Sequence, residues 1–270
     1  MWDHHLLRAV NVTRYVTPLR EGGSLPAIVE ADDLGTYVLK FRGAGQGRKA
    51  LVAEVVAGEI ARRLRLAVPE LVLATLDPEL ARTEPDPEIQ DLIRSSAGLN
   101  LAMDYLPGSL GFDPLVEPPS PDLASRIVWF DALVQNVDRS PRNTNLLVWH
   151  RKLWLIDHGA SLYFHHNWPA WLDSPDRRAA SQRPYAAARG HVLLPFAARI
   201  AEADATLAPK LTPDVVRMAV DLVPEDWLRD EPGFEGPEEV RSAYLEYLSA
   251  RLEEPRGWAR DLEETRGLSV

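Results

Sequence analysis

The sequence predicts an α+β protein whose first part is a small antiparallel β-sheet with one main helix and whose second part is mostly α-helical. Short runs that alternate apolar and polar residues dominate the first hundred positions, which is the pattern of half-buried strands. One strongly amphipathic stretch, residues 49–66, interrupts these runs. Beyond Gly108, apolar residues recur mainly at helical spacing. We therefore expect two lobes, residues 1–106 and residues 107–270, with the boundary near Pro107.

The composition is that of a soluble globular protein. The chain has 270 residues, enough for one large domain or two lobes, and 46% of them are hydrophobic. A net charge of −10 argues against a general nucleic-acid binder, because such proteins gain affinity by neutralising phosphates. The absence of cysteine excludes disulfides, thiolate metal ligands and cysteine nucleophiles. No apolar run approaches the roughly 18 residues of a membrane span, and the N-terminus does not resemble a secretory signal, so we expect a cytoplasmic protein.

The first lobe has several short strands and a possible phosphate-binding turn. The turn Gly22-Gly23-Ser24 separates the first two strands, and its backbone N–H groups could surround phosphate oxygens. Glycine pairs are more often simple hairpin turns, so this feature alone is a weak indication. A short helix is expected at 86–95. Strands are expected at residues 6–16, 27–30, 36–41, 71–77 and 99–106.

Lys40 lies in an otherwise apolar strand, on the same face as Val38. A single lysine in a strand is usually an edge charge. The helix expected at 49–66 changes this expectation, because it carries Glu54 beside its apolar stripe, where Glu54 could turn inward and pair with Lys40. Glu59 is the competing partner on the same helix. A strand lysine tied to a helix glutamate is the arrangement that kinases use to hold nucleotide phosphates.

A dinucleotide-binding fold is an alternative for the first lobe. Gly43, Gly45 and Gly47 follow a strand and open a helix, as in a dinucleotide fingerprint. The spacing differs, because Arg48 stands where the third glycine belongs. The acid that ends the next strand, Asp77, lies 34 residues beyond Gly43 rather than about 20. No further strand–helix–strand units follow, so the pattern disfavours this alternative.

Met103, Asp104, Tyr105 and Leu106 end the last strand of the first lobe. Their position just before Pro107 suits a connector that presents backbone amides to the adenine of a bound nucleotide. The same residues are also compatible with a plain final strand of the sheet, and both interpretations remain open.

The most informative stretch is the loop at residues 136–145, NVDRSPRNTN. A helix expected at 123–134 leads into it, and two short strands expected at 145–150 and 152–157 follow it. The second strand ends in Asp157-His158-Gly159. Acids and amides are therefore concentrated in a loop that apolar elements hold in place, and such loops often carry chemistry.

Asp138, Asn143 and Asp157 form a pattern suited to magnesium-assisted phosphoryl transfer. Asp138 would accept or orient the proton of an attacking hydroxyl, while Asn143 and Asp157 would offer a neutral and a charged oxygen to a metal ion. Magnesium takes few protein ligands and leaves its other positions to phosphate and water, which fits one carboxylate and one amide. Each residue alone is more often a turn former, but the joint spacing favours a phosphotransfer site. We expect the intervening His158 to be structural.

The remainder of the sequence predicts a covering bundle of helices at 192–203, 213–222 and 240–252. His165 and His166 could suggest a metal site. Adjacent histidines are expected to point to different sides, and no carboxylate is near, so packing and surface roles are favoured.

The order of these features resembles the HipA-like kinases, which are relatives of the phosphatidylinositol 3- and 4-kinases and of the protein-kinase fold. The resemblance covers about residues 10–165, and its most specific part is Asn-x-Asp-Arg-x3-Asn at 136–143. It implies a two-lobed, protein-kinase-like fold that uses ATP and Mg²⁺. Residues 1–106 would then form a nucleotide-binding N-lobe, and residues 107–270 a helical C-lobe that carries the catalytic loop and the metal-binding Asp.

The resemblance also implies roles for individual residues. Asp138 would be the catalytic base, Asn143 and Asp157 would hold the metal, and Lys40 would contact phosphates. The chain departs from the related kinases at Ser140, where they often have His. It also lacks the kinase Gly-x-Gly-x-x-Gly turn, and the expected absence of the N-terminal extension of the HipA toxins argues against a toxin role.

We therefore expect an ATP- and Mg²⁺-dependent phosphotransferase that acts on a protein serine or threonine hydroxyl. A small-molecule or lipid kinase is a second hypothesis, because the catalytic loop does not encode the acceptor. A nucleotide-binding pseudokinase or regulatory module is a third. The expected partners are ATP and a protein or small molecule that bears a hydroxyl, without a membrane span or general nucleic-acid binding.

Overall fold

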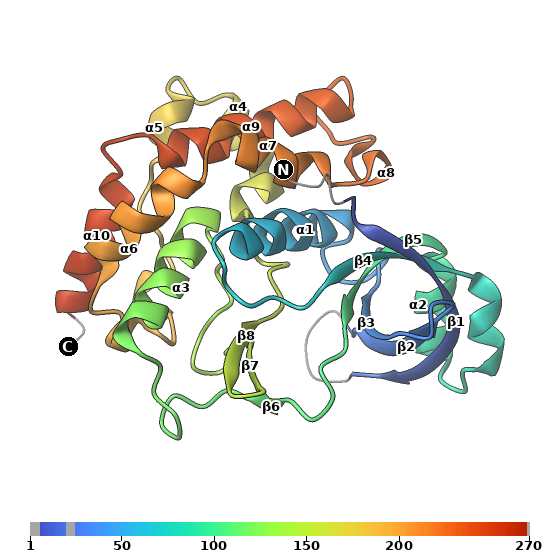
Figure 1. Cartoon of the computed structure of the whole chain (residues 1–270). Helices are drawn as coiled ribbons and strands as arrows, with labels where there is room; N and C mark the ends of the chain where they lie inside the picture. The colour runs from blue at the N-terminus through green and yellow to red at the C-terminus, as the bar shows by residue number, and fades with distance from the viewer. Residues whose placement is uncertain (1–5, 20–24, 269–270) are drawn as a thin grey trace. The chain divides into compact units, whose positions relative to one another are not determined.

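The computed structural model describes residues 6–19 and 25–268 of the chain (Figure 1). Contacts within the chain divide it into two compact units. The first unit contains the residues up to 52 together with residues 69–108, and the second contains residues 53–68 and everything from residue 109 onward. Residues 53–68 therefore group with the later, mostly helical unit, although the sequence analysis assigned them to the first lobe.

The strands of the first unit form a closed barrel in the order β1-β2-β3-β5-β4. Alternate residues of each strand face its interior, so that β2 buries Ala27 and Val29 completely. The helix α2 (Pro87–Ser95) adds Ile89 and Ile93 to the same core. The strands are β1 (Arg8–Pro18), β2 (Ala27–Ala31), β3 (Thr36–Lys40), β4 (Leu71–Leu76) and β5 (Gly98–Asp104).

The barrel is closed by a parallel pair of strands. β1 runs parallel to β4, with Arg8 opposite Val72 and Asn11 opposite Thr75, whereas the other neighbouring pairs are antiparallel. The purely antiparallel sheet expected from the sequence is therefore wrong for this pair. Apolar alternation indicates which residues face the core, but it carries no information about the direction of a neighbouring strand.

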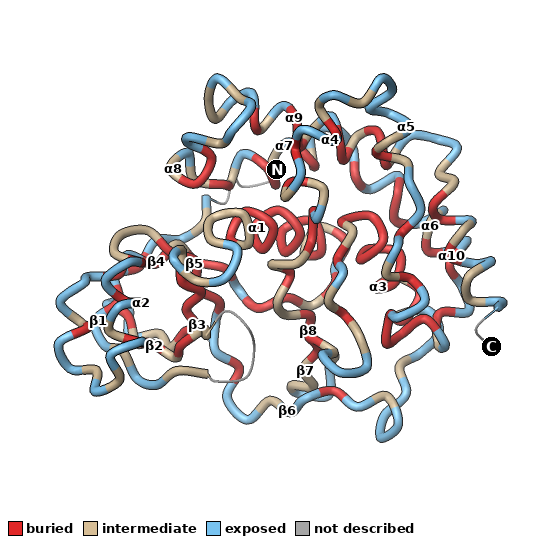
Figure 2. The backbone as a smooth tube through the Cα atoms, turned by 180° about the vertical axis from the view of Figure 1, so that it is seen from behind, coloured by how far each residue is buried: buried red, intermediate tan, exposed pale blue. Residues whose placement is uncertain are grey.

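The helix α1 (Arg48–Arg63) is buried on all sides over residues 51–61. Figure 2 shows this stretch as a continuous buried segment. The division between the two units falls within this helix, after Val52. A helix buried all round must supply partners for its polar side chains, because an unpaired buried charge is costly. Glu54 and Glu59 are the buried acids of this helix.

The second unit contains a small antiparallel sheet in the order β6-β7-β8. β6 is Leu110–Gly111, β7 is Leu146–Trp149 and β8 is Lys152–Leu155. The hairpin expected from the sequence is present, with strands slightly shorter than expected. Its turn consists of His150 and Arg151, and both have positive φ angles, 47° and 62°.

The helix α3 (Pro121–Val134) is the buried centre of the second unit (Figure 2). Its N-terminus is capped by Ser120, whose hydroxyl accepts a hydrogen bond from the N–H of Leu123 at 3.2 Å. The helix ends at Gln135, which adopts a left-handed φ of 52°. The completely buried Arg251 donates hydrogen bonds to the carbonyl oxygens of Ala132 and Leu133, at 2.6 and 2.8 Å. These bonds satisfy carbonyls that a helix end leaves without a partner.

Most of the remaining chain is helical, and one expected helix is broken. The helix expected at 192–203 is instead a 3₁₀ turn, η4 (Leu194–Phe196), followed by α6 (Ile200–Leu207). Pro195 lies in that turn, and a proline within an α-helix removes a backbone donor and clashes with the preceding turn.

The other helices are α4 (Trp168–Leu172), α5 (Arg177–Ser181), α7 (Pro213–Asp221), α8 (Glu225–Leu228), α9 (Pro237–Leu252) and α10 (Gly257–Gly267). The other 3₁₀ turns are η1 (Pro78–Thr83), η2 (Tyr163–Asn167), η3 (Ala188–Gly190) and η5 (Ala208–Lys210). Within residues 6–19 and 25–268, no helix has both the length and the apolar character needed to cross a membrane.

Candidate active site

The loop that follows α3 is attached to the helix by Asn136. The side chain of Asn136 is completely buried. Its Nδ2 donates to Oδ1 of Asp131 at 3.1 Å, and its Oδ1 accepts a hydrogen bond from the N–H of Asp138 at 3.1 Å. The hydroxyl of Tyr185 donates to the backbone carbonyl of Asn136. Three independent bonds therefore fix the backbone just before Asp138.

A buried cluster of Asp131, Arg139 and His191 also holds this loop. Nε of Arg139 donates to Oδ2 of Asp131 at 2.6 Å, and Nε2 of His191 donates to the same oxygen at 2.9 Å. The N–H of Leu193 donates to Nδ1 of His191 at 3.0 Å. Since Nδ1 accepts a bond, a ring proton is on Nε2, where it faces Asp131.

The cluster keeps the carboxyl of Asp131 ionised. Burial would raise the pKa of Asp131, but the positive charge of Arg139 and the hydrogen bond from His191 lower it to about 2. Arg139 also donates to the backbone carbonyls of Thr144 and Asn145, at the start of β7. One guanidinium therefore connects α3 to both ends of the loop.

Asp138 is contacted by two amide side chains at the surface of the loop. Nδ2 of Asn143 donates to Oδ2 of Asp138 at 2.8 Å, and Nδ2 of Asn145 donates to the same oxygen at 3.3 Å. Asn145 also donates to the backbone carbonyl of Asp138 at 3.1 Å. The structure therefore brings together Asp138 and Asn143, which the sequence analysis proposed, and adds Asn145, which it did not propose as a site residue.

Asp157 follows β8 with a left-handed φ of 55° and lies within electrostatic range of Asp138. Burial raises the pKa of Asp138, and the negative charge of Asp157 raises it further, against the lowering effect of the bonds from Asn145 and Asn143. Two carboxylates that repel each other in this way favour a cation near both. The structure thus also places the third expected residue in this site.

The site has oxygen ligands suited to magnesium but too few to hold it alone. No group of three or more His, Cys, Asp or Glu side chains that could hold a metal occurs among the described residues. Asn143 and Asp157 would provide one amide and one carboxylate oxygen, and Mg²⁺ commonly completes its coordination with substrate phosphates and water. The residues therefore fit a metal that arrives with a phosphate-bearing substrate.

His158 and Glu54 form a second buried pair next to Asp157. Nδ1 of His158 lies 3.3 Å from Oε1 of Glu54, and both side chains are completely buried. The Nε2 atom of His158 is buried and has no hydrogen-bond partner among the described residues, and its ring makes a T-shaped contact with Phe130. The competing acid, Glu59, is instead bonded to Nε of Arg62 at 3.1 Å. Glu54 therefore contacts the residue beside Asp157, in the same unit as the loop.

Other candidate residues lie in the first unit. Lys40 is the last residue of β3 and is 9% exposed.

The N–H groups of Asp104 and Tyr105, in the expected connector, already bond to the carbonyls of Glu70 and Thr36, at 2.9 and 3.0 Å. Among the described residues, the N–H of Leu106 makes no such bond, so it is the free donor of the expected connector. Met103 lies within β5, and Gly22, Gly23 and Ser24 lie outside the described residues.

The structure gives Gly43, the first glycine of the disfavoured dinucleotide motif, a packing role. The N–H of Gly43 donates to Oγ of Ser96 at 3.1 Å. A Cβ atom at Gly43 would lie only 2.8 Å from that oxygen. The turn is therefore built against α2, and the barrel is unlike the open parallel sheet of dinucleotide-binding domains.

The expectation that His165 and His166 point to different sides is wrong. Their Nε2 atoms lie 3.1 Å apart, and Nδ1 of His165 bonds to the hydroxyl of Tyr244 at 2.9 Å. The two rings form an edge contact in a 3₁₀ turn, η2, where consecutive side chains diverge less than in an extended strand.

The loop residues were predictable from the spacing of their acids and amides, but the buried supports were not. Asp131 is an acid within the apolar helix pattern of residues 123–134, and buried acids are rare unless they are paired. This signal could have marked Asp131 as functional or structural. Nothing local in the sequence indicates its partner His191, which lies 60 residues away.

The fold and family follow from comparison with known proteins. Among solved structures, the chain is similar to a proinflammatory kinase, CtkA, from Helicobacter pylori, with 13% identity, a TM-score of 0.56 and coverage of 97% of this chain and 99% of that one. This establishes a kinase-like fold. A mutant PAN3 pseudokinase from Neurospora crassa matches with 14% identity over 99% of this chain and 70% of that one, but its TM-score of 0.32 is too low to establish a common fold.

The family assignment rests on the sequence. A comparison with curated protein sequences finds no match. A family model described as HipA-like kinase matches residues 12–260, which include the whole loop at 136–145 and Asp157. The chain belongs to the HipA-like kinase family.

Proposed function

We propose that the protein is an ATP- and Mg²⁺-dependent phosphotransferase that phosphorylates a serine or threonine hydroxyl of a protein. The observation that carries this proposal is the arrangement of Asp138, Asn143 and Asp157 in one loop system. Asn143 contacts Asp138 at 2.8 Å, and Asp157 acts electrostatically on the same carboxyl. Membership of a kinase family and the kinase-like fold support it.

In the proposed reaction, Asp138 is the general base. One of its oxygens is held by the amides of Asn143 and Asn145, which leaves the other oxygen to accept a proton. As the acceptor hydroxyl oxygen bonds to the γ-phosphorus of ATP, its proton passes to Asp138 and the bond to the leaving ADP oxygen breaks. A carboxyl with a raised pKa is a better proton acceptor than an ordinary one, provided that it is ionised at the working pH.

The other candidate residues would hold the nucleotide. Asn143 and Asp157 would bind Mg²⁺, which when present neutralises charge on the phosphates. Lys40 would contact the phosphates, with Glu54 as its support on α1. The residues proposed to surround the rest of the nucleotide are Gly22, Gly23 and Ser24 at the phosphates and Met103, Asp104, Tyr105 and Leu106 at the adenine. In this proposal, residues 1–106 act as the nucleotide-binding lobe and residues 107–270 as the catalytic lobe.

The test compares Asp138→Ala with a matched control in phosphate transfer from labelled ATP. Asp214→Ala is the control, because Asp214 is an exposed acid on α7 whose carboxylate makes no hydrogen bond or ion pair with the described residues. Loss of a general base lowers kcat by roughly 10²- to 10⁴-fold, so we expect that loss for Asp138→Ala and none for Asp214→Ala. Full transfer by Asp138→Ala contradicts the mechanism.

The same assay separates the alternative functions. Protein and metabolite fractions are offered as acceptors in parallel, and labelled metabolites without labelled protein identify a small-molecule or lipid kinase. Binding of ATP and Mg²⁺ in calorimetry without transfer to any acceptor identifies a pseudokinase.

A further inference from the structure

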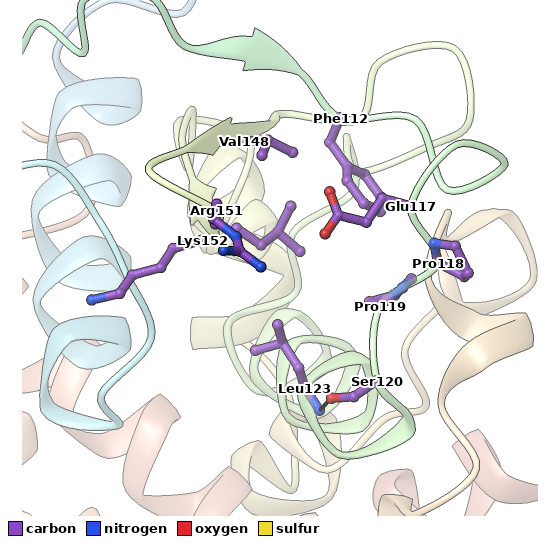
Figure 3. Close-up of a pocket in the computed structure, with 10 residues that line it drawn as sticks. Phe112, Glu117, Pro118, Pro119, Ser120, Leu123, Val148, Arg151 and Lys152 are labelled. Atoms are coloured by element: carbon purple, nitrogen blue, oxygen red, sulfur yellow. Dashed lines mark hydrogen bonds between the residues drawn. The ribbon is translucent and has the colours of Figure 1, made fainter.

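A surface cavity of about 170 Å³ lies in the second unit, away from the loop residues described above. It is formed by the segment that leads into α3, the first turn of α3 and the β7–β8 hairpin. Figure 3 shows side chains from these elements around a common space, with the guanidinium of Arg151 directed toward it and the Lys152 side chain extending away from it. Its apolar walls are Phe112, Pro118, Pro119, Leu123, Val148 and Leu153. An apolar cavity of about 150 Å³ in another protein holds benzene, so this one has room for a single large apolar side chain.

Two cations of the β7–β8 hairpin line this cavity, Arg151 in the turn and Lys152 at the start of β8. Arg151 and Lys152 are both exposed, and the side chain of neither makes a hydrogen bond or ion pair with any described residue. Glu117 lines the same cavity without contacting either of them within ion-pair distance. In a chain of net charge −10, an unneutralised pair of cations beside an apolar cavity selects for an acidic ligand with an apolar group.

The backbone at this turn holds Arg151 in a conformation that is costly for a residue with a side chain. Trp149 pairs with Lys152, so the hairpin loop is the two residues His150 and Arg151. Both have left-handed φ angles, as in the type I′ turn that strongly favours asparagine and glycine. Residues with bulky side chains that are kept in such a conformation often mark functional sites.

Exposed apolar side chains lie next to the cavity in the sequence. Leu110, Leu115 and Val116 are 71%, 89% and 81% exposed, and they belong to the same short segment as the lining residues Phe112 and Glu117. Contiguous exposed apolar patches often belong to interaction surfaces, and Leu115 and Val116 are adjacent in the chain. Packing within the described part of the protein does not explain them.

We propose that this surface docks the protein substrate, through an acidic segment that inserts one apolar side chain into the cavity and places its carboxylates against Arg151 and Lys152. The inference rests on the proposed kinase function and specifies its acceptor as a protein with such a segment. β7 begins directly after Asn145 and contains four residues, which at about 3.4 Å per residue puts the hairpin turn roughly 14 Å from the catalytic loop. The phosphorylated hydroxyl is therefore expected about four or more residues from the apolar anchor.

The first experiment measures binding by fluorescence anisotropy, without ATP, so that its result does not depend on catalysis. The probe is a labelled 12-residue peptide of glutamates and serines around one leucine, tested against the full chain. The charge-reversal variant is Arg151→Glu/Lys152→Glu. The matched control is Lys210→Glu/Arg217→Glu, which makes the same charge change at exposed cations of the same unit.

We expect the wild-type protein and the control to bind the probe alike and the charge-reversal variant to bind at least about tenfold more weakly, with a strong dependence on salt. Replacing the leucine of the probe by serine is expected to weaken binding to the wild type. Equal binding by the two double variants, or equal binding of the leucine and serine probes, would overturn the proposal.

The second experiment separates this inference from the proposed function. Peptides that place a serine five residues from the acidic-leucine segment are offered with ATP and Mg²⁺, and a rise in KM with unchanged kcat is expected for Arg151→Glu/Lys152→Glu. Phosphorylation that is indifferent to this variant would remove the docking site and leave the kinase function intact. Binding of the probe without any phosphate transfer by the wild type would remove the kinase function and leave the docking surface in place.

Discussion

His158 hydrogen-bonds to Glu54 through Nδ1 and Oε1, 3.3 Å apart, in a completely buried environment. The pair joins α1 to the residue next to Asp157, although the two side chains are 104 positions apart in the sequence. His158 was expected to be structural, and the structure shows what it contacts. Because Asp157 is the proposed metal ligand, we expect this bond to hold α1 and the metal-binding residue in a fixed relation.

Replacing His158 by Phe tests this bond. The aromatic ring can keep its packing against Phe130, but the hydrogen bond to the buried Glu54 is lost. Hydrogen bonds to charged groups contribute roughly 1.5–3 kcal/mol, and we expect a fall of this size in the free energy of unfolding, measured by urea denaturation. The exposed His150→Phe is the control and should change stability by less than about 0.5 kcal/mol. An unchanged unfolding midpoint for His158→Phe contradicts the assignment.

Replacing Asp131 by Asn leaves the buried Arg139 without its carboxylate. Breaking a buried ion pair from one side costs roughly 3–5 kcal/mol, because a charge remains unpaired. We expect a loss of that order for Asp131→Asn in chemical denaturation. As the control, Asp91→Asn removes the exposed pair with Arg94, and exposed pairs contribute about 0–1 kcal/mol. Similar small losses in both variants would show that the buried cluster does not hold the loop.

The buried Asp131 should also make stability depend on pH in the acid range. Its pKa is about 2 in the folded protein, against 3.8 for an ordinary aspartate. Because the pKa is lower in the folded state, the ionised carboxyl of Asp131 contributes fully to stability above about pH 4. This contribution, roughly 2–3 kcal/mol of unfolding free energy, is lost as the pH falls from about 4 through about 2. Urea unfolding at pH 5 and at pH 3 should show a smaller pH effect in Asp131→Asn than in the wild type. An equal effect in both would contradict the low pKa.

Asn145 should set the acid limb of the activity profile. The pKa of Asp138 is raised by burial and by Asp157, and the hydrogen bond from Asn145 opposes the rise. In the proposed mechanism phosphate transfer needs ionised Asp138, so activity should fall as the pH drops through a pKa above the ordinary range of aspartate. Asn145→Gly tolerates the left-handed φ of 48° and removes the amide, so the acid limb of kcat/KM should move to higher pH.

The control for this variant is His150→Gly, which changes a residue with nearly the same φ, 47°, on the hairpin turn. It should leave the acid limb where it is in the wild type. A shift of the Asn145→Gly profile to lower pH, or the same shift in both variants, would show that the amide does not tune Asp138.

The sequence predicted the local features of the fold well. Strand alternation located the barrel strands, helical periodicity located α3, and the spacing of Asp138 and Asn143 indicated two side chains that the structure finds in contact. These features depend on residues that are close in the sequence. The parallel β1–β4 pair was missed, because strand direction depends on how the barrel closes rather than on the pattern within either strand.

The buried supports of the site were missed for a related reason. Asp131 and His191 are 60 residues apart, and Glu54 and His158 are 104 residues apart. Each pair is defined by tertiary packing, so neither partner has a local pattern that identifies the other. A polar residue within an apolar run, such as Asp131 in α3, indicates only that some partner must exist.

The bond between Arg251 and the C-terminal end of α3 has a consequence for the order of events during synthesis. Arg251 is made 118 positions after Leu133, which at about 5–20 residues per second is a delay of roughly 6–24 s. Throughout this interval the carbonyls that precede the catalytic loop lack their final donor. A nascent chain would therefore carry the whole loop at 136–145 well before Arg251 could complete the hydrogen bonds at the end of α3.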